Sequence, residues 1–397
     1  MSSNGFLPSE SFKGIMRFVR FIGKILGADI YVPNYRFNVI TTIVTAIITI
    51  YISFTVFTVI EEMNWMFGLQ ACCMIGSAVQ GVNKLYTGVS TSRQVYDLMQ
   101  IITGIYEEYE IETDPEGLEL YDDSYKDILW QSLHRTKRSL IATAISYILA
   151  MFGMVGTPLI AGFVTGNRYM IMHFRIPGVD PSGQIGYILT QSAHALCICC
   201  GAFGLYAGDI CIIIYLLQSF IFADILRLKV RSLNLFVEEQ SEDKYKQATK
   251  MLTNIIEWQQ KYQSFVCDCN DVFYSMVSVQ ITTSAVCIVL TIFVTLTTEW
   301  LAAYPYLICI IPNMYLYCIL GTLLENCNDD IMYEIYNISF YNLSAEQQRM
   351  VLFMLAKSQR PETIQLLGVL PLAVSTALAI TKNIYSITMM MVQFLMK

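Results

Sequence analysis

Seven long runs of apolar residues dominate the hydropathy pattern of the chain. Each run is about 20 residues or longer, the length that an α-helix needs to cross the ~30 Å hydrocarbon core of a membrane. The runs cover residues 39–60, 65–86, 140–164, 185–222, 272–298, 301–324 and 364–396. Pro371 interrupts the seventh run, where a kink or break is expected. The pattern predicts an all-α membrane protein with seven transmembrane helices.

Lys and Arg residues lie almost entirely on one side of these runs. Twenty of the 25 fall in one alternating set of segments, namely residues 1–38, 87–139, 223–271 and 325–363. Three (Arg168, Arg175 and Lys397) fall in the other set, and Lys84 and Lys382 lie inside the apolar runs. Because basic residues next to transmembrane helices mark the cytoplasmic side, we predict a cytoplasmic N-terminus and an extracellular C-terminus.

This topology divides the chain into three parts. Residues 1–38 form a cytoplasmic N-terminal segment. Residues 39–324 hold the first six transmembrane helices, a ligand pocket and cytoplasmic helical extensions, and residues 325–397 hold a cytoplasmic anchor helix and the seventh transmembrane helix. In the second cytoplasmic segment, Trp258, Tyr262 and Phe265 recur at helical spacing on one face. A helical bundle below the membrane is therefore expected there, with a solvated loop as the alternative.

The composition excludes several classes of protein. Apolar residues make up 55% of the chain and charged residues only 14%, whereas soluble domains are about 25% charged. The formal charge of −7 gives no reason to expect a nucleic-acid partner. Most of the twelve cysteines lie within apolar runs, where they act as small hydrophobic residues. No catalytic motif or metal-ligand pattern is present, so neither enzymatic activity nor a metal or cofactor is expected.

The outer halves of several apolar runs combine apolar side chains with a few polar ones. Small-molecule pockets between helices have this composition, although an ordinary bundle core has it too, and both interpretations stay open. His194 is either hydrogen-bonded between helices or in contact with a ligand. The candidate pocket residues are Leu69, Cys73, Met154, Thr157, Ile188, Gln191, His194, Tyr304 and Ile308.

The last 70 residues carry a series of short motifs. Residues 335–343 (IYNISFYNL) resemble the LYNxxWYxL run of insect odorant receptors, and residues 358–361 (SQRP) are similar to their SQKP. The run GVLPL at 368–372 follows, and then Thr376, Lys382 and Tyr385. Residues 388–394 (TMMMVQF) resemble the TYhhhhhQF ending of the wider odorant and gustatory receptor superfamily, with Ser386 and Ile387 in place of its Thr-Tyr pair. Order and spacing of the motifs agree with the odorant receptors.

The resemblance implies a subunit of an odorant-gated, non-selective cation channel in the plasma membrane of olfactory neuron dendrites. Family members form heterotetramers in which odour-tuned subunits join a shared co-receptor. A small volatile odorant binds in the outer half among the second to sixth helices, and cytoplasmic helices hold the subunits together. Residues 223–270 are too short for the insertion of the co-receptor, so a tuning subunit is expected. The end of the seventh helix lines the pore, with Met390, Gln393 and Phe394 as candidate pore or gate residues.

Three alternatives are less consistent with the sequence. The SQRP and IYNISFY runs favour an odorant receptor over a gustatory receptor channel of the same superfamily. A transporter is expected to show two matching repeats with broken helices, and no such repeat is found. A G-protein-coupled receptor has its N-terminus outside and carries DRY-like and NPxxY motifs, neither of which is present.

Overall fold

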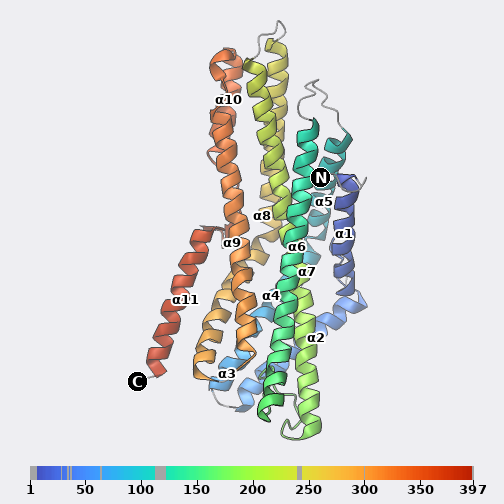
Figure 1. Cartoon of the computed structure of the whole chain (residues 1–397), viewed down its shortest axis with the longest axis vertical. Coiled ribbons are helices and arrows are strands. Elements are labelled where there is room, and N and C mark those ends of the chain that lie inside the picture. The colour runs from blue at the N-terminus through green and yellow to red at the C-terminus, as the bar shows by residue number, and fades with distance from the viewer. Residues whose placement is uncertain are drawn as a thin grey trace.

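The structure, a computed structural model of the whole chain, is an elongated bundle of α-helices (Figure 1). It describes residues 7–27, 29–33, 35, 38–62, 65–111, 122–238, 244–298 and 300–395. Some positions used above, including Arg36 and residues 1–6, 396 and 397, lie outside the described residues. The described helices are α1 (Pro8–Ile25), α2 (Val39–Glu62), α3 (Trp65–Cys72), α4 (Ile75–Ser90), α5 (Ser92–Ile111), α6 (Asp122–Thr165), α7 (Gln184–Glu238), α8 (Lys244–Thr297), α9 (Ala303–Tyr336), α10 (Ala345–Ser358) and α11 (Val374–Leu395).

Two short elements interrupt the helical pattern near the C-terminal end. A 3-10 helix, η1 (Phe340–Asn342), precedes α10, and an antiparallel hairpin of β1 (Gln365–Leu366) and β2 (Leu370–Pro371) precedes α11. Leu367 and Gly368 turn the hairpin with φ angles of 53° and 70°. Glycine adopts this left-handed backbone without steric cost, whereas leucine does not. This hairpin lies between α10 and α11 and separates the two helices.

The predicted all-helical fold is confirmed, and the boundaries of two apolar runs differ from the prediction. Five helices in the described part of the chain are long and apolar enough to cross a membrane, namely α2, α6, α7, α8 and α9. The second run is divided into α3 and α4 by a break at residues 73 and 74. The seventh helix begins at Val374, because residues 364–373 form the hairpin instead. The count of seven spans and the orientation of the termini stay predictions.

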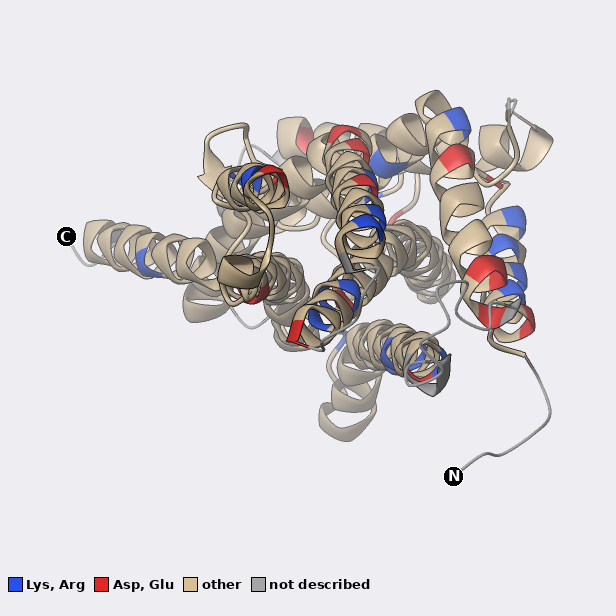
Figure 2. Ribbon diagram, turned by 90° about the horizontal axis from the view of Figure 1, so that it is seen from above, with Lys and Arg blue, Asp and Glu red and all other residues tan. Residues whose placement is uncertain are grey.

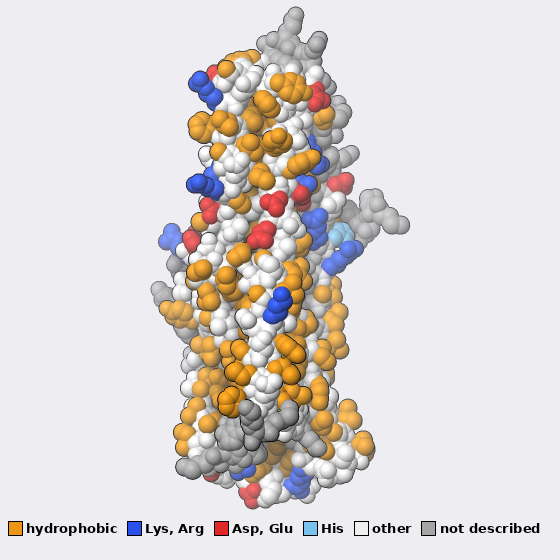
Figure 3. Space-filling view, turned by 90° about the vertical axis from the view of Figure 1, so that its left-hand side faces the viewer, with side chains coloured by type: hydrophobic (Ala, Val, Ile, Leu, Met, Phe, Trp, Pro, Cys, Tyr) orange, Lys and Arg blue, Asp and Glu red, His pale blue; other side chains and the backbone are white. Residues whose placement is uncertain are grey.

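The half of the bundle farther from α10 has an apolar exterior. On the face shown in Figure 3, charged side chains gather over the upper half and along the lower rim, and the coloured side chains in the region between are mainly hydrophobic. The hydroxyls in α2 are satisfied locally, because Thr45, Thr49 and Ser53 each donate to the carbonyl four residues earlier. A helix in lipid needs such internal partners, since hydrocarbon offers none.

The other half consists of helices that continue beyond this apolar region. The aromatic face predicted from the sequence is buried there: Trp258 Nε1 donates to the carbonyl of Phe222 at 3.0 Å, and the rings of Phe222 and Phe265 stack with centroids 4.5 Å apart. Tyr262 donates to Asn328 Oδ1 at 2.6 Å and so joins α8 to α9. The prediction of helices between residues 223 and 270 is confirmed for the described residues.

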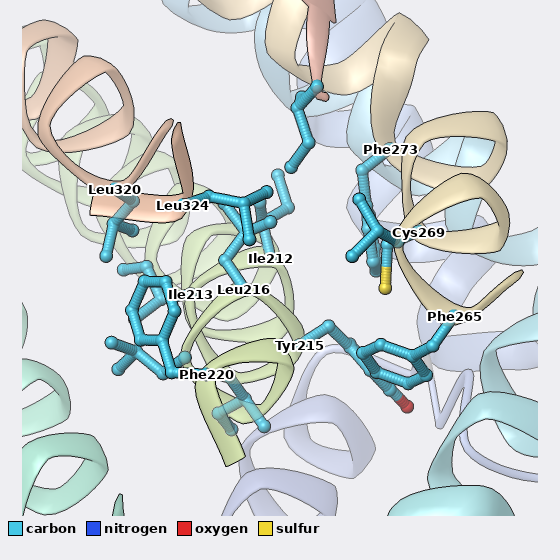
Figure 4. Packing of buried hydrophobic residues seen from close by; sticks show 14 of the residues in the cluster. Ile212, Ile213, Tyr215, Leu216, Phe220, Phe265, Cys269, Phe273, Leu320 and Leu324 are labelled. Carbon is cyan, nitrogen blue, oxygen red and sulfur yellow. The ribbon is translucent and has the colours of Figure 1, made fainter. Parts of the chain in front are cut away.

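The core where the two halves meet is built around α7. Ile212 and Leu216 of α7 lie between Leu324 of α9 and Cys269 and Phe273 of α8 (Figure 4). These side chains are buried. At roughly 25 cal/mol per Å² of apolar surface removed from solvent, such packing fixes the relative positions of the three long helices where they leave the apolar region.

The last helix is attached to the bundle by only part of its surface. Ala377, Ile384 and Thr388 form its buried stripe, while large apolar side chains on its other faces are exposed. Figures 1 and 2 both show α11 extending away from the remaining helices. At its start, the Val374 N–H donates to Thr322 Oγ1 of α9 at 2.9 Å. The isolated chain therefore leaves much of α11 without a protein neighbour.

Gly321 on α9 permits this attachment, and its replacement tests the packing. A Cβ atom at position 321 would overlap the carbonyl oxygen of Leu372. We expect Gly321→Ala to cost about 1–3 kcal/mol in overpacking, which exceeds the gain of about 1 kcal/mol in helix propensity. Thermal unfolding of the purified protein and hydrogen exchange at residues 364–376 measure the effect.

Gly104→Ala is the matched control, because a Cβ at this exposed position of α5 meets no atom within 4 Å. It should leave stability unchanged or raise it slightly. Equal stability of the two variants would contradict the proposed close approach of α9 to the hairpin.

Candidate ligand cavity

A cavity of about 210 Å³ lies inside the bundle. Its walls come from α1, α2, α4, α6, α7, α8 and α9 and are mostly apolar. Along α7 the lining residues run from Cys197 to Gly208, which corresponds to about 16 Å of helix. The cavity is smaller than the ~300–1,000 Å³ typical of sites for drug-sized molecules. It therefore suits a small apolar compound.

One end of the cavity lies next to the loop 166–183, which joins α6 to α7. Met172 of this loop lines the cavity together with Met154 of α6 and Tyr306 of α9. The hydroxyls of Tyr306 and Ser77 are 3.0 Å apart and hydrogen-bonded. This end is therefore mostly apolar, and we call it the loop end.

The other end contains a buried pair of charges. The Lys84 ammonium of α4 donates to the Asp209 carboxylate of α7, which also accepts hydrogen bonds from Tyr147 of α6 and Tyr317 of α9. All four side chains are buried. Gly208 gives Lys84 its space, since a Cβ there would lie 2.5 Å from Lys84 Cδ. We call this region the charged end.

The loop 166–183 is held over the cavity by buried side chains of α7. The Met172 N–H donates to His194 Nδ1 at 3.3 Å, and His194 Nε2 lies 3.0 Å from the Phe174 carbonyl. These two bonds require neutral His194 with its proton on Nε2. Gln191 accepts from the Ile171 N–H at 3.3 Å and donates to the Tyr169 carbonyl at 2.6 Å.

Other elements fasten the same loop. Trp300 Nε1 donates to the Ile171 carbonyl at 3.1 Å, and the Arg175 N–H donates to Thr58 Oγ1 of α2 at 2.8 Å. Burial lowers the pKa of His173 to about 4, so this imidazole is neutral at physiological pH. The loop is thus a packed cover whose backbone groups have partners on α2, α7 and the α8–α9 connection.

The structure brings one of the nine predicted pocket residues, Met154, into the cavity. Gln191 and His194 instead bind the loop. Leu69 and Cys73 pack in a second apolar cluster with Trp300, and Thr157 is half-buried without lining the cavity. His194 is therefore hydrogen-bonded, although its partners are backbone groups of the loop and not of a neighbouring helix.

The remaining predicted residues point outward. Ile188 of α7 is exposed and does not line the cavity. Tyr304 and Ile308 are exposed as well, because the side of α9 that faces the cavity carries Tyr306, Cys309 and Ile310. The candidate pore residues Met390, Gln393 and Phe394 lie exposed on α11, apart from the cavity.

Several residues of the cavity were missed by sequence reasoning. They are Tyr51, Ser77, Gln80, Gln280 and Asn313, polar side chains within apolar helices. Lys84 and Asp209 were visible as charges inside apolar runs, and such charges are expected to pair. Their 125-residue separation gave no indication that they pair with each other.

Comparison with known proteins identifies the class of this helical bundle. Residues 64–385 match the family model described as 7tm Odorant receptor. The chain belongs to the insect odorant receptor family. Putative odorant receptor 83c of Drosophila melanogaster is 30% identical over 396 residues, which cover 97% of this chain and 98% of the relative. Odorant receptor 85f of the same species is 23% identical over 294 residues, with 70% and 72% covered.

Solved structures share the fold of this odorant receptor. The olfactory receptor OR5 of Machilis hrabei aligns with a TM-score of 0.79, 14% identity, and 97% and 99% of the two chains covered. The same OR5 in complex with eugenol aligns with a TM-score of 0.78 and 13% identity over the same shares. At this identity the likeness shows the fold, and it supports the arrangement of helices described above.

Replacing His194 tests whether it fastens the loop of this receptor. We expect His194→Ala to leave the Met172 N–H and the Phe174 carbonyl without partners, at a cost of about 1–3 kcal/mol. Hydrogen exchange at residues 170–175 should accelerate about tenfold or more.

Ser192→Ala on the same helix is the control, because the exposed Ser192 hydroxyl donates only to the Ile188 carbonyl of its own helix. It should leave the exchange of the loop unchanged. Unaltered exchange in the His194 variant would show that the loop is held by other contacts.

Proposed function

We propose that this receptor is the odorant-binding subunit of a heteromeric, odorant-gated, non-selective cation channel in the plasma membrane of olfactory neuron dendrites. The observation that carries the proposal is the small, mostly apolar cavity between the helices of an odorant receptor family member. A volatile compound in such a cavity gains from leaving water. It opens the channel only if it binds the open state more tightly than the closed state.

The helices are consistent with seven crossings of the membrane. Five come from α2, α6, α7, α8 and α9. The sixth comes from α3 and α4 in series, and the seventh from α11, whose 22 residues span about 33 Å. The excess of Lys and Arg in segments on the α10 side favours a cytoplasmic position for that end and for the N-terminus. The loop 166–183 then faces the exterior.

The exposed surface of α11 supports a role at the pore. Met390 and Phe394 are four residues apart on one face of the helix, with Gln393 beside them, and all three are exposed. In an assembly, these faces would meet the corresponding helices of other subunits. Apolar side chains can close a pore by excluding water, and an amide can hydrate a passing ion.

An apolar surface far from the membrane region supports assembly with a partner. We call it the anchor patch: Tyr333, Tyr336, Phe340, Tyr341, Leu352 and Phe353 are exposed on the end of α9, on η1 and on α10. Exposed apolar patches outside the bilayer mark contacts with other proteins. We propose that the co-receptor subunit covers this patch in a heterotetramer.

Heterologous expression tests the proposed function. With the co-receptor, an odorant panel should evoke a non-selective cation current within milliseconds, and the receptor alone should give little current. The odorant-evoked current is measured by whole-cell recording, with and without a block of G proteins. A response that disappears when G proteins are blocked would contradict a directly gated channel.

The pore assignment has its own test in the same cells. Gln393→Ala and Phe394→Ala should shift the reversal potential or alter gating. Phe163→Ala removes an exposed aromatic side chain from the end of α6 and is the control. Similar effects of all three variants would remove the end of α11 from the ion path.

A further inference from the structure

The charged end of the cavity holds more hydrogen-bonding capacity than the protein itself uses. At the loop end, by contrast, the hydroxyls of Ser77 and Tyr306 bond each other. Gln80, nearer the charged end, is also occupied: its Nε2 donates to Thr283 Oγ1 at 2.8 Å and to Ser284 Oγ at 3.1 Å. Among the described residues that line the cavity, Lys84, Gln280 and the hydroxyls of Tyr31 and Tyr51 have capacity to spare. Lys84 and Gln280 lie close together, on α4 and α8 where these two helices meet.

Lys84 can donate further hydrogen bonds. An ammonium carries three N–H donors, and among the described residues its one acceptor is Asp209. The Asp209 carboxylate accepts from Lys84, Tyr147 and Tyr317, which occupies three of its roughly four acceptor sites. Lys84 lines the cavity and is only 5% exposed. Its remaining donors therefore lie in a buried region beside the cavity.

Gln280 supplies an acceptor at the same end. Its side chain lines the cavity and is 2% exposed, and its Oε1 has no hydrogen-bond partner among the described residues. A buried polar atom without a partner costs free energy, and most such atoms in native proteins are satisfied. An oxygen of this kind beside a ligand cavity is best explained by a group on the ligand.

Gln80 shows that Lys84 and Gln280 lie near each other. Its Nε2 reaches the backbone carbonyl of Gln280 at 3.4 Å, so α4 and α8 meet there. Lys84 follows Gln80 by four residues on α4 and thus shares its face of the helix. A donor and an acceptor therefore flank one short stretch of the cavity, whereas its remaining walls are mostly apolar.

We propose that Lys84 and Gln280 form a polar anchor that selects uncharged odorants carrying a hydroxyl group on an apolar body. A hydroxyl both donates and accepts, so it satisfies Gln280 Oε1 and a free N–H of Lys84. It also fits Gln280 with its amide oxygen and nitrogen exchanged. This inference rests on the proposed function, and it adds the chemical class of the ligand and its orientation, with the hydroxyl toward the charged end.

The charge balance excludes carboxylate ligands. Lys84 and Asp209 neutralise each other, so a bound carboxylate would leave a net negative charge buried in the bundle. An alkane leaves Gln280 Oε1 and the remaining N–H donors of Lys84 without a partner. Alcohols should therefore bind more tightly than alkanes or carboxylates of the same size.

Ligand binding to the purified full chain in lipid nanodiscs tests the proposal without requiring an open channel. The probes are alcohol and alkane pairs of equal heavy-atom count, from cyclohexanol with methylcyclohexane to 1-octanol with n-nonane, together with heptanoate. Affinity is measured from the rise in unfolding temperature with ligand concentration. At least one alcohol should bind about tenfold or more tightly than its paired alkane and than heptanoate.

Two near-isosteric variants locate the anchor. Gln280→Met should abolish the preference for the alcohol. Tyr51→Phe should retain it: the Tyr51 hydroxyl also lines the cavity without a partner, but its ring lies 5.5 Å from Phe174 of the loop, near the opposite end. Loss of the preference in Tyr51→Phe but not in Gln280→Met would overturn the proposal.

The remaining outcomes separate this inference from the proposed function. Equal binding of alcohols and alkanes, or no binding of any alcohol, overturns the anchor even if odorants evoke currents in cells. Selective binding of alcohols that depends on Gln280, without any current in the presence of the co-receptor, supports the anchor and contradicts the channel. Should Gln280→Met fail to fold, Gln280→Leu carries the same expectation.

Discussion

A buried ion pair decides how the transmembrane helices of this receptor fit together. Lys84 and Asp209 lie in apolar helices, where an unpaired charge costs several kcal/mol. The Asp209 carboxylate also accepts from Tyr147 and Tyr317, so that α4, α6, α7 and α9 each contribute one side chain. A sliding of any one of these helices would break a buried hydrogen bond of this cluster. The cavity extends from this ion pair toward the loop 166–183.

The cluster around Lys84 and Asp209 also connects the cavity to α11, through Tyr317 of α9. Tyr317 belongs to a stretch of α9 that also touches the hairpin and α11. One turn later, Gly321 meets the backbone of Leu372 and Thr322 accepts from the Val374 N–H. A ligand that changes the hydrogen bonds of Lys84 therefore acts on a cluster that shares α9 with the start of α11. In the proposed gating, a change at the cavity would therefore reach the start of α11 through one stretch of α9.

The sequence predicted the helices well because hydrophobic length and periodicity depend on local chemistry. The continuation of α7 and α8 beyond the apolar region followed from the spacing of Trp258, Tyr262 and Phe265. The break at residues 73 and 74 was missed, because no proline or glycine at those positions marks it. The hairpin before α11 was anticipated only as an interruption at Pro371.

The cavity could not be predicted to the same degree, because it depends on the rotation of each helix. Tyr304 and Tyr306 lie two residues apart in the same apolar run, yet only Tyr306 faces the cavity. For His194 the sequence left a bond between helices and a ligand contact open, and in the structure its ring bonds the backbone of a loop about 20 residues earlier. The pairing of Lys84 with Asp209 depends on which helices are neighbours. The hydrophobic periodicity of the sequence does not give this information.

A double-mutant cycle between Lys84 and Asp209 tests the central claim most directly. Lys84→Met and Asp209→Asn each leave one buried charge without its counterion, and each should destabilise the purified receptor by about 3–5 kcal/mol. The double variant removes both charges and keeps an acceptor for Tyr147 and Tyr317, so it should recover most of the lost unfolding temperature. Additive losses in the double variant, or single variants as stable as the parent chain, would contradict the account.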